Sequence, residues 1–214
     1  MKLSKKHLQE TVYDVLLATY ESPDAVRSSK RTDILHEGFA NYAIDFPSMS
    51  SFVQSFEQKV NSADGSFKID LLCDDGTTEI LFLLKQVGSS YNKNRKNYAN
   101  TTMGEVFRSL PGFPNRKVAH INFIPESAPC FDKSGDIKRV ERTNRQDLSH
   151  FYKAVRGLYS DRAAECILKF RIDEDLLFSK TRKELYDGLC RHGLGSVQLL
   201  NYEEFTNSLE NFLG

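Results

Sequence analysis

The apolar positions of the first sixty residues recur every three or four places, which is the spacing of a buried helical face. Leu8, Val12 and Val15 begin such a pattern, which predicts an amphipathic helix over residues 4–20. A second helix is expected to begin at the N-cap residue Thr32 and to stop before Pro47. A third, shorter helix is expected over residues 51–60.

From residue 67 onward the pattern changes to that of strands. Residues 67–73 form an apolar run, and Asp74-Asp75-Gly76 is a strong hairpin signal. The returning strand, residues 79–86, is apolar on both faces until its end. A strand of this kind belongs in the interior of a sheet that helices cover on both sides.

The rest of the chain alternates between helices and strands. Expected in order are a polar loop (88–102), a helix (104–110), a strand (117–124), a loop (125–136), a helix (147–159), a strand (166–172), a helix (174–190), a strand (196–200) and a helix (202–213). Alternation favours an α/β fold with a central mixed β-sheet flanked by helices. We expect one domain, residues 1–214, in which residues 160–214 form a βαβα extension.

The amino-acid composition excludes few classes of function. Lys plus Arg equals Asp plus Glu at 29 each, so net charge does not indicate a partner. The four cysteines form no CxxC pair, which disfavours structural zinc. The histidines form no HxH or HExxH motif, and no phosphate-binding loop or nucleophile elbow is present. Without a signal peptide or a long apolar run, a cytoplasmic protein with no membrane partner is expected.

Asp70 and Lys85 are the residues that suggest chemistry. Asp70 interrupts an apolar strand, where an ionised carboxylate is costly unless a cation or a donor meets it. A hairpin that turns at Asp75-Gly76 places Asp70 opposite residues 81–83, so the side chain of Lys85 could reach the same point. An acid and a lysine that converge at the end of a sheet can bind a divalent ion and orient a water molecule.

This arrangement resembles the PD-(D/E)XK nuclease superfamily, which includes many restriction endonucleases. The family pattern is an Asp, a short spacer, then Glu or Asp, any residue, and Lys. Asp70 matches the first acid and Lys85 the lysine, within a core of residues 33–124. The sequence departs from the pattern at Leu83, where the family has its second acid, and at Ile69, where the family often has proline.

The resemblance implies a Mg²⁺-dependent endonuclease that cleaves double-stranded DNA, with a restriction endonuclease-like core. Asp70 would bind the metal, and Lys85 would orient the attacking water. Glu105, narrowly favoured, or Glu37 would supply the acid that is missing at Leu83. Restriction enzymes commonly act as homodimers, so a homodimer is also implied. Simpler interpretations stay open: Lys85 as an ion-pair partner of Asp70, Glu37 as a solvated residue, and Glu105 as a helix-end charge.

A nucleic-acid surface is expected directly after Lys85, because residues 80–104 contain no acid. Hydroxyls, amides and cations suit phosphate contacts, and tyrosine rings suit base stacking. The residues expected to contact DNA are Ser89, Ser90, Tyr91, Asn92, Lys93, Asn94, Arg95, Lys96, Arg142 and Arg145.

Two other classes of function remain. One is a catalytically inactive nucleic-acid-binding or protein-interaction subunit on the same scaffold, in which Leu83 marks a lost site. The other is a globular adaptor unrelated to nucleic acid. Metal-dependent cleavage of DNA distinguishes the enzyme from both.

Overall fold

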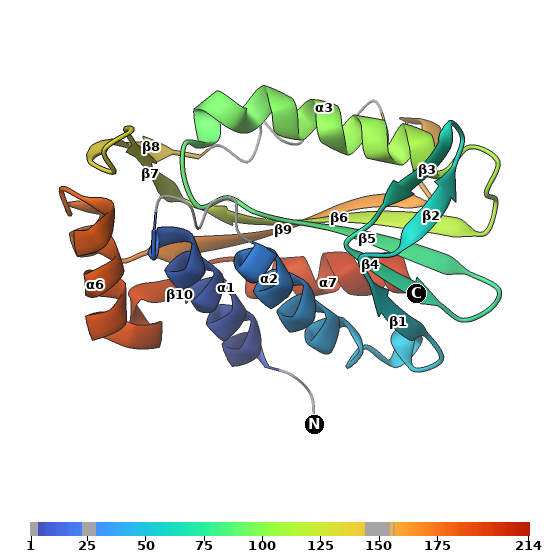
Figure 1. Cartoon of the computed structure of the whole chain (residues 1–214). Helices are drawn as coiled ribbons and strands as arrows, with labels where there is room; N and C mark the ends of the chain where they lie inside the picture. Colours follow the sequence, from blue (N-terminus) through green and yellow to red (C-terminus); the bar gives the residue numbers. More distant parts are fainter. Residues whose placement is uncertain (1–3, 23–28, 144–154, 156) are drawn as a thin grey trace.

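A mixed sheet forms the centre of the protein (Figure 1). The computed structural model describes residues 4–22, 29–143, 155 and 157–214, apart from the side chains of Asn92, Lys93 and Arg95. Within these residues six strands pair in the order β1-β4-β5-β6-β9-β10. The strands are β1 (Val53–Phe56), β4 (Leu71–Asp74), β5 (Glu79–Gln86), β6 (Arg116–Pro125), β9 (Ala163–Ile172) and β10 (Val197–Leu199). The predicted α/β fold with a mixed sheet is confirmed.

The sheet changes from antiparallel to parallel at β5. β1, β4 and β5 pair antiparallel, β5, β6 and β9 pair parallel, and β10 returns antiparallel to β9. The predicted turn at Asp74-Asp75-Gly76 does join β4 to β5. Gly76 adopts the left-handed φ of 86° that such a tight turn favours.

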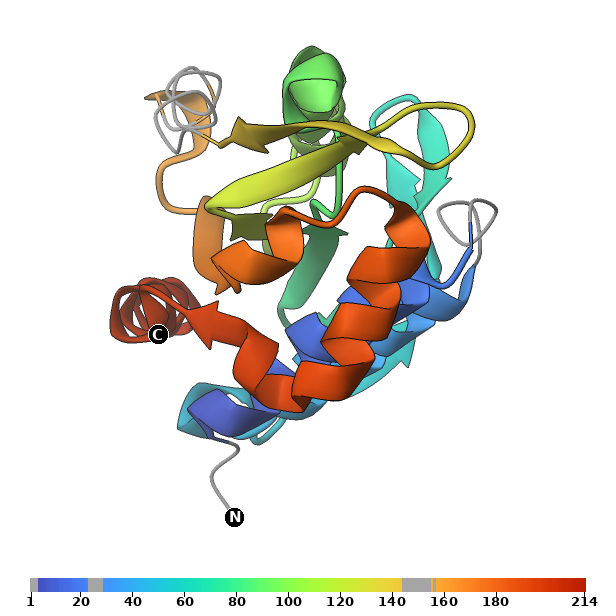
Figure 2. The same cartoon turned by 90° about the vertical axis from the view of Figure 1, so that its left-hand side faces the viewer.

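Helices cover both faces of the sheet (Figures 1 and 2). α1 (Lys5–Tyr20), α2 (Ser29–Ala43) and α7 (Tyr202–Leu213) pack on one face, and α3 (Tyr91–Ser109) lies over the other. Successive residues of β5 point to opposite faces. Phe82 and Leu84 therefore join the cluster under α1, α2 and α7, whereas Leu81 and Leu83 join the cluster under α3. This explains why β5 is apolar on both sides.

Smaller elements lie outside the six-stranded sheet and the helices that cover it. They are the β2 (Lys59–Ser62) and β3 (Gly65–Lys68) hairpin, the β7 (Ser127–Phe131) and β8 (Ile137–Arg142) hairpin, α5 (Glu174–Leu177), α6 (Arg182–His192), and the 3₁₀ turns η2 (Pro47–Met49) and η3 (Gly193–Ser196). In the described part of the chain, no helix combines the length and the apolar character needed to cross a bilayer.

Several sequence predictions about local structure are wrong. Residues 51–60 form β1 and the start of β2 rather than a helix, and Val53 is 69% exposed on an edge strand. The loop expected at 125–136 is largely the β7–β8 hairpin. The strand expected at 67–73 is divided between β3 and β4, and the helix expected at 174–190 is divided between α5 and α6. Most of the helix expected at 147–159 lies outside the described residues.

The largest correction concerns the polar segment 88–102, most of which belongs to the long helix α3. The buried positions Tyr91, Ala99 and Val106 of α3, and Leu110 directly after it, do follow helical spacing. Between them lie small and polar residues such as Thr102, which is also buried. The buried face of α3 was therefore not recognisable from the sequence, because small and polar residues make up much of it.

Candidate functional site

The register of the β4–β5 hairpin brings Asp70 and Lys85 near enough to influence each other electrostatically. Leu71 pairs with Phe82, so Asp70, one residue before β4, lies opposite Leu83. The Asp70 carboxylate accepts a hydrogen bond from the backbone N–H of Leu84 at 2.6 Å. Lys85 follows Leu83 by two residues and so shares its face of the sheet. The charge of Lys85 lowers the pKa of Asp70, although burial of the carboxyl, the largest effect, keeps that pKa raised.

Glu105 reaches this pair from α3, which lies over the same face. Its Oε2 is 3.6 Å from Lys85 Nζ, and the two side chains are only 22% and 24% exposed. Burial raises the pKa of Glu105, and Asp70 raises it further, while Lys85 lowers it. An acid before β4, a lysine on β5 and an acid on α3 thus influence one another electrostatically at one end of the strands.

His120 lies beneath Glu105 on the neighbouring strand β6. Its Cα is paired with that of Leu83, and its Nδ1 is 3.8 Å from Glu105 Oε2. The ring is fully buried. Burial, helped by the charge of Lys85, lowers the pKa of His120 to about 3. The imidazole is therefore neutral at neutral pH, and the cation of the site is Lys85.

A second group contacts Asp70 from the other side. His36 of α2 places Nε2 3.6 Å from Asp70 Oδ1 and Nδ1 3.2 Å from Glu57 Oε1. Glu57 follows β1 in a left-handed conformation with φ of 52°, which is uncommon for a residue other than glycine. Lys68 forms an ion pair with Glu57. One imidazole and two carboxylates, from His36, Glu57 and Asp70, offer ligand atoms within 4.8 Å of one another, which is a spacing that could hold a metal ion.

Unpaired polar atoms concentrate in this region. Among the described residues, seven buried side-chain nitrogen and oxygen atoms have no hydrogen-bond partner. Five of the seven belong to the group just described: His36 Nε2, Lys85 Nζ, Glu105 Oε2 and both ring nitrogens of His120. A buried polar group without a partner is destabilising, so such a cluster is a place where a water molecule, an ion or a substrate group would supply the missing contacts.

Comparisons with known proteins do not add a family. No family model, curated protein or solved structure matches the chain. The side chains of the site are therefore the basis for its functional interpretation.

Glu37 is placed differently from the other predicted site residues. It is exposed on α2, whereas its neighbour His36 is 2% exposed and turned toward Asp70. From this helix the structure brings His36, rather than the predicted Glu37, to Asp70. Sequence reasoning also missed Glu57, whose position depends on the pairing of β1 with β4 and carries no local signal in the sequence.

The predicted DNA-contacting residues fall into four groups. Ser89, Ser90 and Asn94 are half-buried, while Lys96 on α3 and Arg142 on β8 are exposed. Tyr91 is fully buried, so its ring is not accessible for stacking on a base, contrary to the sequence prediction. The side chains of Asn92, Lys93 and Arg95 and the whole of Arg145 lie outside the described residues.

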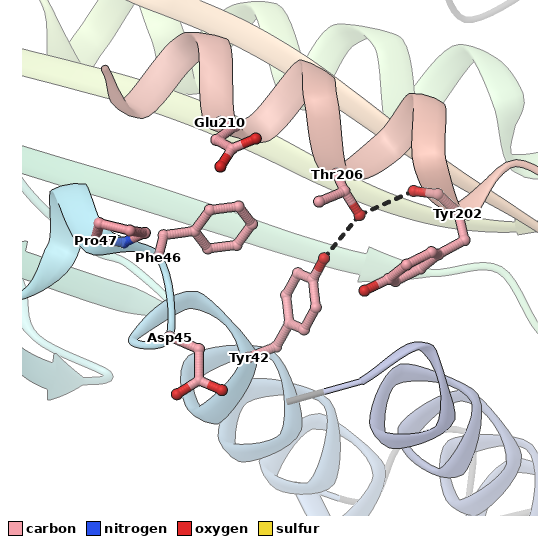
Figure 3. A pocket seen from close by; sticks show the side chains of 7 residues that line it. All are labelled: Tyr42, Asp45, Phe46, Pro47, Tyr202, Thr206 and Glu210. Atoms are coloured by element: carbon pink, nitrogen blue, oxygen red, sulfur yellow. Dashed lines mark hydrogen bonds between the residues drawn. The ribbon is translucent and has the colours of Figure 1, made fainter. Parts of the chain in front are cut away.

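A separate pocket lies between the C-terminal end of α2 and α7 (Figure 3). It encloses about 120 Å³ and is lined by Tyr42, Asp45, Phe46, Pro47, Tyr202, Thr206 and Glu210. Tyr42 Oη and Thr206 Oγ1 are hydrogen-bonded at 2.8 Å across it. It contains none of the residues gathered around Asp70, and no lysine or arginine lines it. The Asp70 region is the stronger candidate for a reaction site.

Proposed function

We propose that the protein is a metal-dependent endonuclease that hydrolyses phosphodiester bonds of double-stranded DNA, on a restriction endonuclease-like core. The observation that carries the proposal is the convergence of Asp70, Lys85 and Glu105 at one end of the sheet. The order of elements supports it as well: a helix, the β1-β4-β5 meander, a helix, and a strand parallel to β5. The resemblance to the PD-(D/E)XK superfamily rests on the part of this order from the Asp70 hairpin to Lys85, the following helix and the next strand.

The donor set fits a divalent cation. Asp70, His36 and Glu57 would hold it, because their ligand atoms lie within 4.8 Å of one another. Glu105, which interacts electrostatically with Asp70, would be a further acid near the ion. Carboxylate oxygens suit Mg²⁺ and Mn²⁺, and an imidazole nitrogen favours the transition metal over Mg²⁺. When bound, such an ion would polarise the phosphate and lower the pKa of a bound water. The unpaired atoms His36 Nε2 and Glu105 Oε2 are consistent with a missing ligand.

The side chains around the donor set would perform the remaining tasks. Lys85 Nζ has no hydrogen-bond partner, so it is available to contact a phosphate oxygen and to stabilise the negative charge that develops on it. Glu105, 3.6 Å away, holds the ammonium group over the sheet. The N–H of Leu84 fixes Asp70 through Oδ2 and leaves Oδ1 directed toward His36. The acid and the lysine are thereby oriented before substrate arrives.

The outer side of α3 suits a polyanion. Its exposed positions include Lys96, Asn97, Asn100 and Thr101, and no carboxylate is among them. Amide and hydroxyl groups donate hydrogen bonds to phosphate oxygens, and Lys96 adds a positive charge. We propose that this part of α3 contacts the DNA backbone next to Lys85.

Cleavage of supercoiled plasmid tests the proposed function. Wild-type protein should nick the plasmid with Mg²⁺ or Mn²⁺ and stop when EDTA is added. Asp70→Ala and Lys85→Ala should each reduce the rate by at least about a hundredfold, because each removes a charged group that faces the reacting phosphate. Glu37→Gln, an exposed change on α2, is the matched control and should leave cleavage intact. Full activity in both site variants, with circular dichroism unchanged, would refute the proposal.

A non-cleaving DNA-binding subunit is the second candidate, and Leu83 favours it. Leu83 is 3% exposed and packs with Leu81 and Val106, so the position of the family's second acid is filled by the apolar core. This candidate predicts that the protein retards DNA in a gel but leaves plasmid supercoiled with every divalent metal.

A further inference from the structure

A cavity of about 200 Å³ opens beside Lys85, on the side that faces α1 and α2. It lies between these two helices, the end of β5 and α3. The residues that line it are Val15, Arg31, Thr32, Leu35, Leu84, Lys85, Gln86 and Tyr98. We refer to it below as the Arg31 cavity.

The Arg31 cavity is positively charged. Arg31 and Lys85 are both among the lining residues, and no carboxylate is. Arg31 is half-buried in the first turn of α2, and among the described residues no acid forms an ion pair with it. Lys85 Nζ and the neighbouring Gln86 Oε1 are both buried without a hydrogen-bond partner. Lys85 is already paired with Glu105, so Arg31 is the cation of the cavity that has no acidic partner among the described residues.

The other polar groups of the cavity add donors. Thr32 and Tyr98 contribute hydroxyls, and Tyr98 is close enough to Arg31 for the guanidinium to oppose the rise in its pKa that burial causes. Gln86 Nε2 donates a hydrogen bond to the carbonyl oxygen of Val12 at 3.2 Å, so this side-chain amide is held in place. A guanidinium, an ammonium and two hydroxyls are groups that bind phosphate oxygens.

The size and the remaining walls of the cavity indicate how much of a ligand it can accept. Its volume is below the roughly 300–1,000 Å³ of pockets that enclose drug-sized molecules. A phosphoryl group is therefore a better match than an entire nucleotide. Val15, Leu35 and Leu84 form apolar walls, and such surroundings strengthen the attraction between the guanidinium of Arg31 and an anion.

We propose that the Arg31 cavity binds a phosphoryl group of the substrate strand. Its assignment to a nucleic-acid strand rests on the proposed nuclease function, whereas the binding of phosphate does not. Lys85 lines both the cavity and the Asp70 site, so a phosphoryl group held by Arg31 sets which neighbouring bond lies beside Asp70. The group can be a terminal phosphomonoester or an internal phosphodiester, since both present non-bridging phosphate oxygens that accept hydrogen bonds.

Calorimetric titration with inorganic phosphate, without metal, tests binding independently of catalysis. Wild-type protein should bind phosphate, and Arg31→Ala should weaken the affinity by about tenfold or more, because a charge-assisted hydrogen bond is lost. Arg31→Lys should recover part of the loss. Arg191→Ala, which removes an exposed arginine in the last turn of α6, is the control and should bind as wild type does. Absence of wild-type binding, or equal binding by Arg31→Ala, overturns the proposal.

Cleavage of matched duplexes in the presence of metal identifies the source of the phosphoryl group. The duplexes carry 5′-phosphate, 3′-phosphate or only hydroxyl ends. If the cavity holds a terminal phosphomonoester, wild type prefers one phosphorylated end and Arg31→Ala abolishes that preference. If it holds an internal phosphodiester, Arg31→Ala slows all three duplexes equally. An unchanged rate on every duplex contradicts the proposal. If the wild type cleaves none of them, the nuclease function fails, and the phosphate titration still decides the cavity.

Discussion

Replacing Leu83 with glutamate places an acid at the one position of β5 where the sequence departs from the nuclease pattern. Leu83 is 3% exposed and packs with Leu81 and Val106 under α3. It also lies opposite Asp70 and two residues before Lys85. The new carboxylate would therefore enter an apolar cluster that borders the proposed metal ligands.

The cost of this change follows from burial. Full burial of a leucine side chain contributes about 1.5–3 kcal/mol, and an unpaired polar group in the same place costs a further 1–3 kcal/mol or so. Without metal, we expect Leu83→Glu to lower the free energy of unfolding by about 4 kcal/mol. For a chain of 214 residues that corresponds to a fall in Tm of about 10 °C. A divalent ion at roughly 100 times its Kd would restore about 2.7 kcal/mol.

Thermal unfolding with and without Mg²⁺ measures both effects. Leu81→Glu is the matched control, because it buries the same group on the same face of β5 but four residues from Lys85. Both variants should be destabilised, and only Leu83→Glu should regain stability with Mg²⁺. Equal recovery in the two variants, or no loss of stability in Leu83→Glu, would show that position 83 does not border a metal site.

Three further predictions concern other parts of the chain. The pKa of His120 is about 3 in the folded protein and ordinarily 6.5, so between these pH values the unfolded chain binds more protons than the folded one. The free energy of unfolding should therefore fall as the pH drops through this range. Urea titrations at several pH values should show a weaker pH dependence of this free energy for His120→Gln. Arg116 is 3% exposed and bonded to Glu79, so Arg116→Met should cost about 3–5 kcal/mol in urea unfolding, and a loss below about 1 kcal/mol would contradict this. Cys190 is exposed whereas Cys73 is buried with its pKa raised to about 12, so a thiol reagent should label Cys190 first in the native protein, and equally fast labelling of Cys73 would be inconsistent with the fold.

Those parts of the fold with a strong local signal were predictable from the sequence. The turn at Asp74-Asp75-Gly76 and the helix at Tyr202–Leu213 have the expected positions, because turn chemistry and a regular apolar stripe specify them. α3 was not predictable in the same way, since Tyr91 and Thr102 do not read as an apolar stripe. β1 was misread because its apolar residues lie on an exposed edge, where pairing with β4 decides the structure.

Some residues of the candidate site were predictable from the sequence and others were not, for the same reason. The meeting of Asp70 and Lys85 follows from a hairpin whose register can be counted along the sequence. Glu105 was named from its position in the following helix. His36 and Glu57 were not foreseen, because the packing of α2 and the edge pairing of β1 bring them to Asp70. Contacts of this kind depend on tertiary structure and have no pattern in a single sequence.

The first helix of the chain is attached to residues that are synthesised much later. Gln9 of α1 donates hydrogen bonds to the carbonyls of Leu194 and Val197, and Tyr13 donates to that of Leu189. At about 5–20 residues per second, a ribosome needs roughly ten to forty seconds to make the intervening chain. For that time the buried side of α1 lacks part of its native cover, and it is then a natural target for chaperones. The complete set of native contacts of α1 can therefore form only after residue 197 has been made.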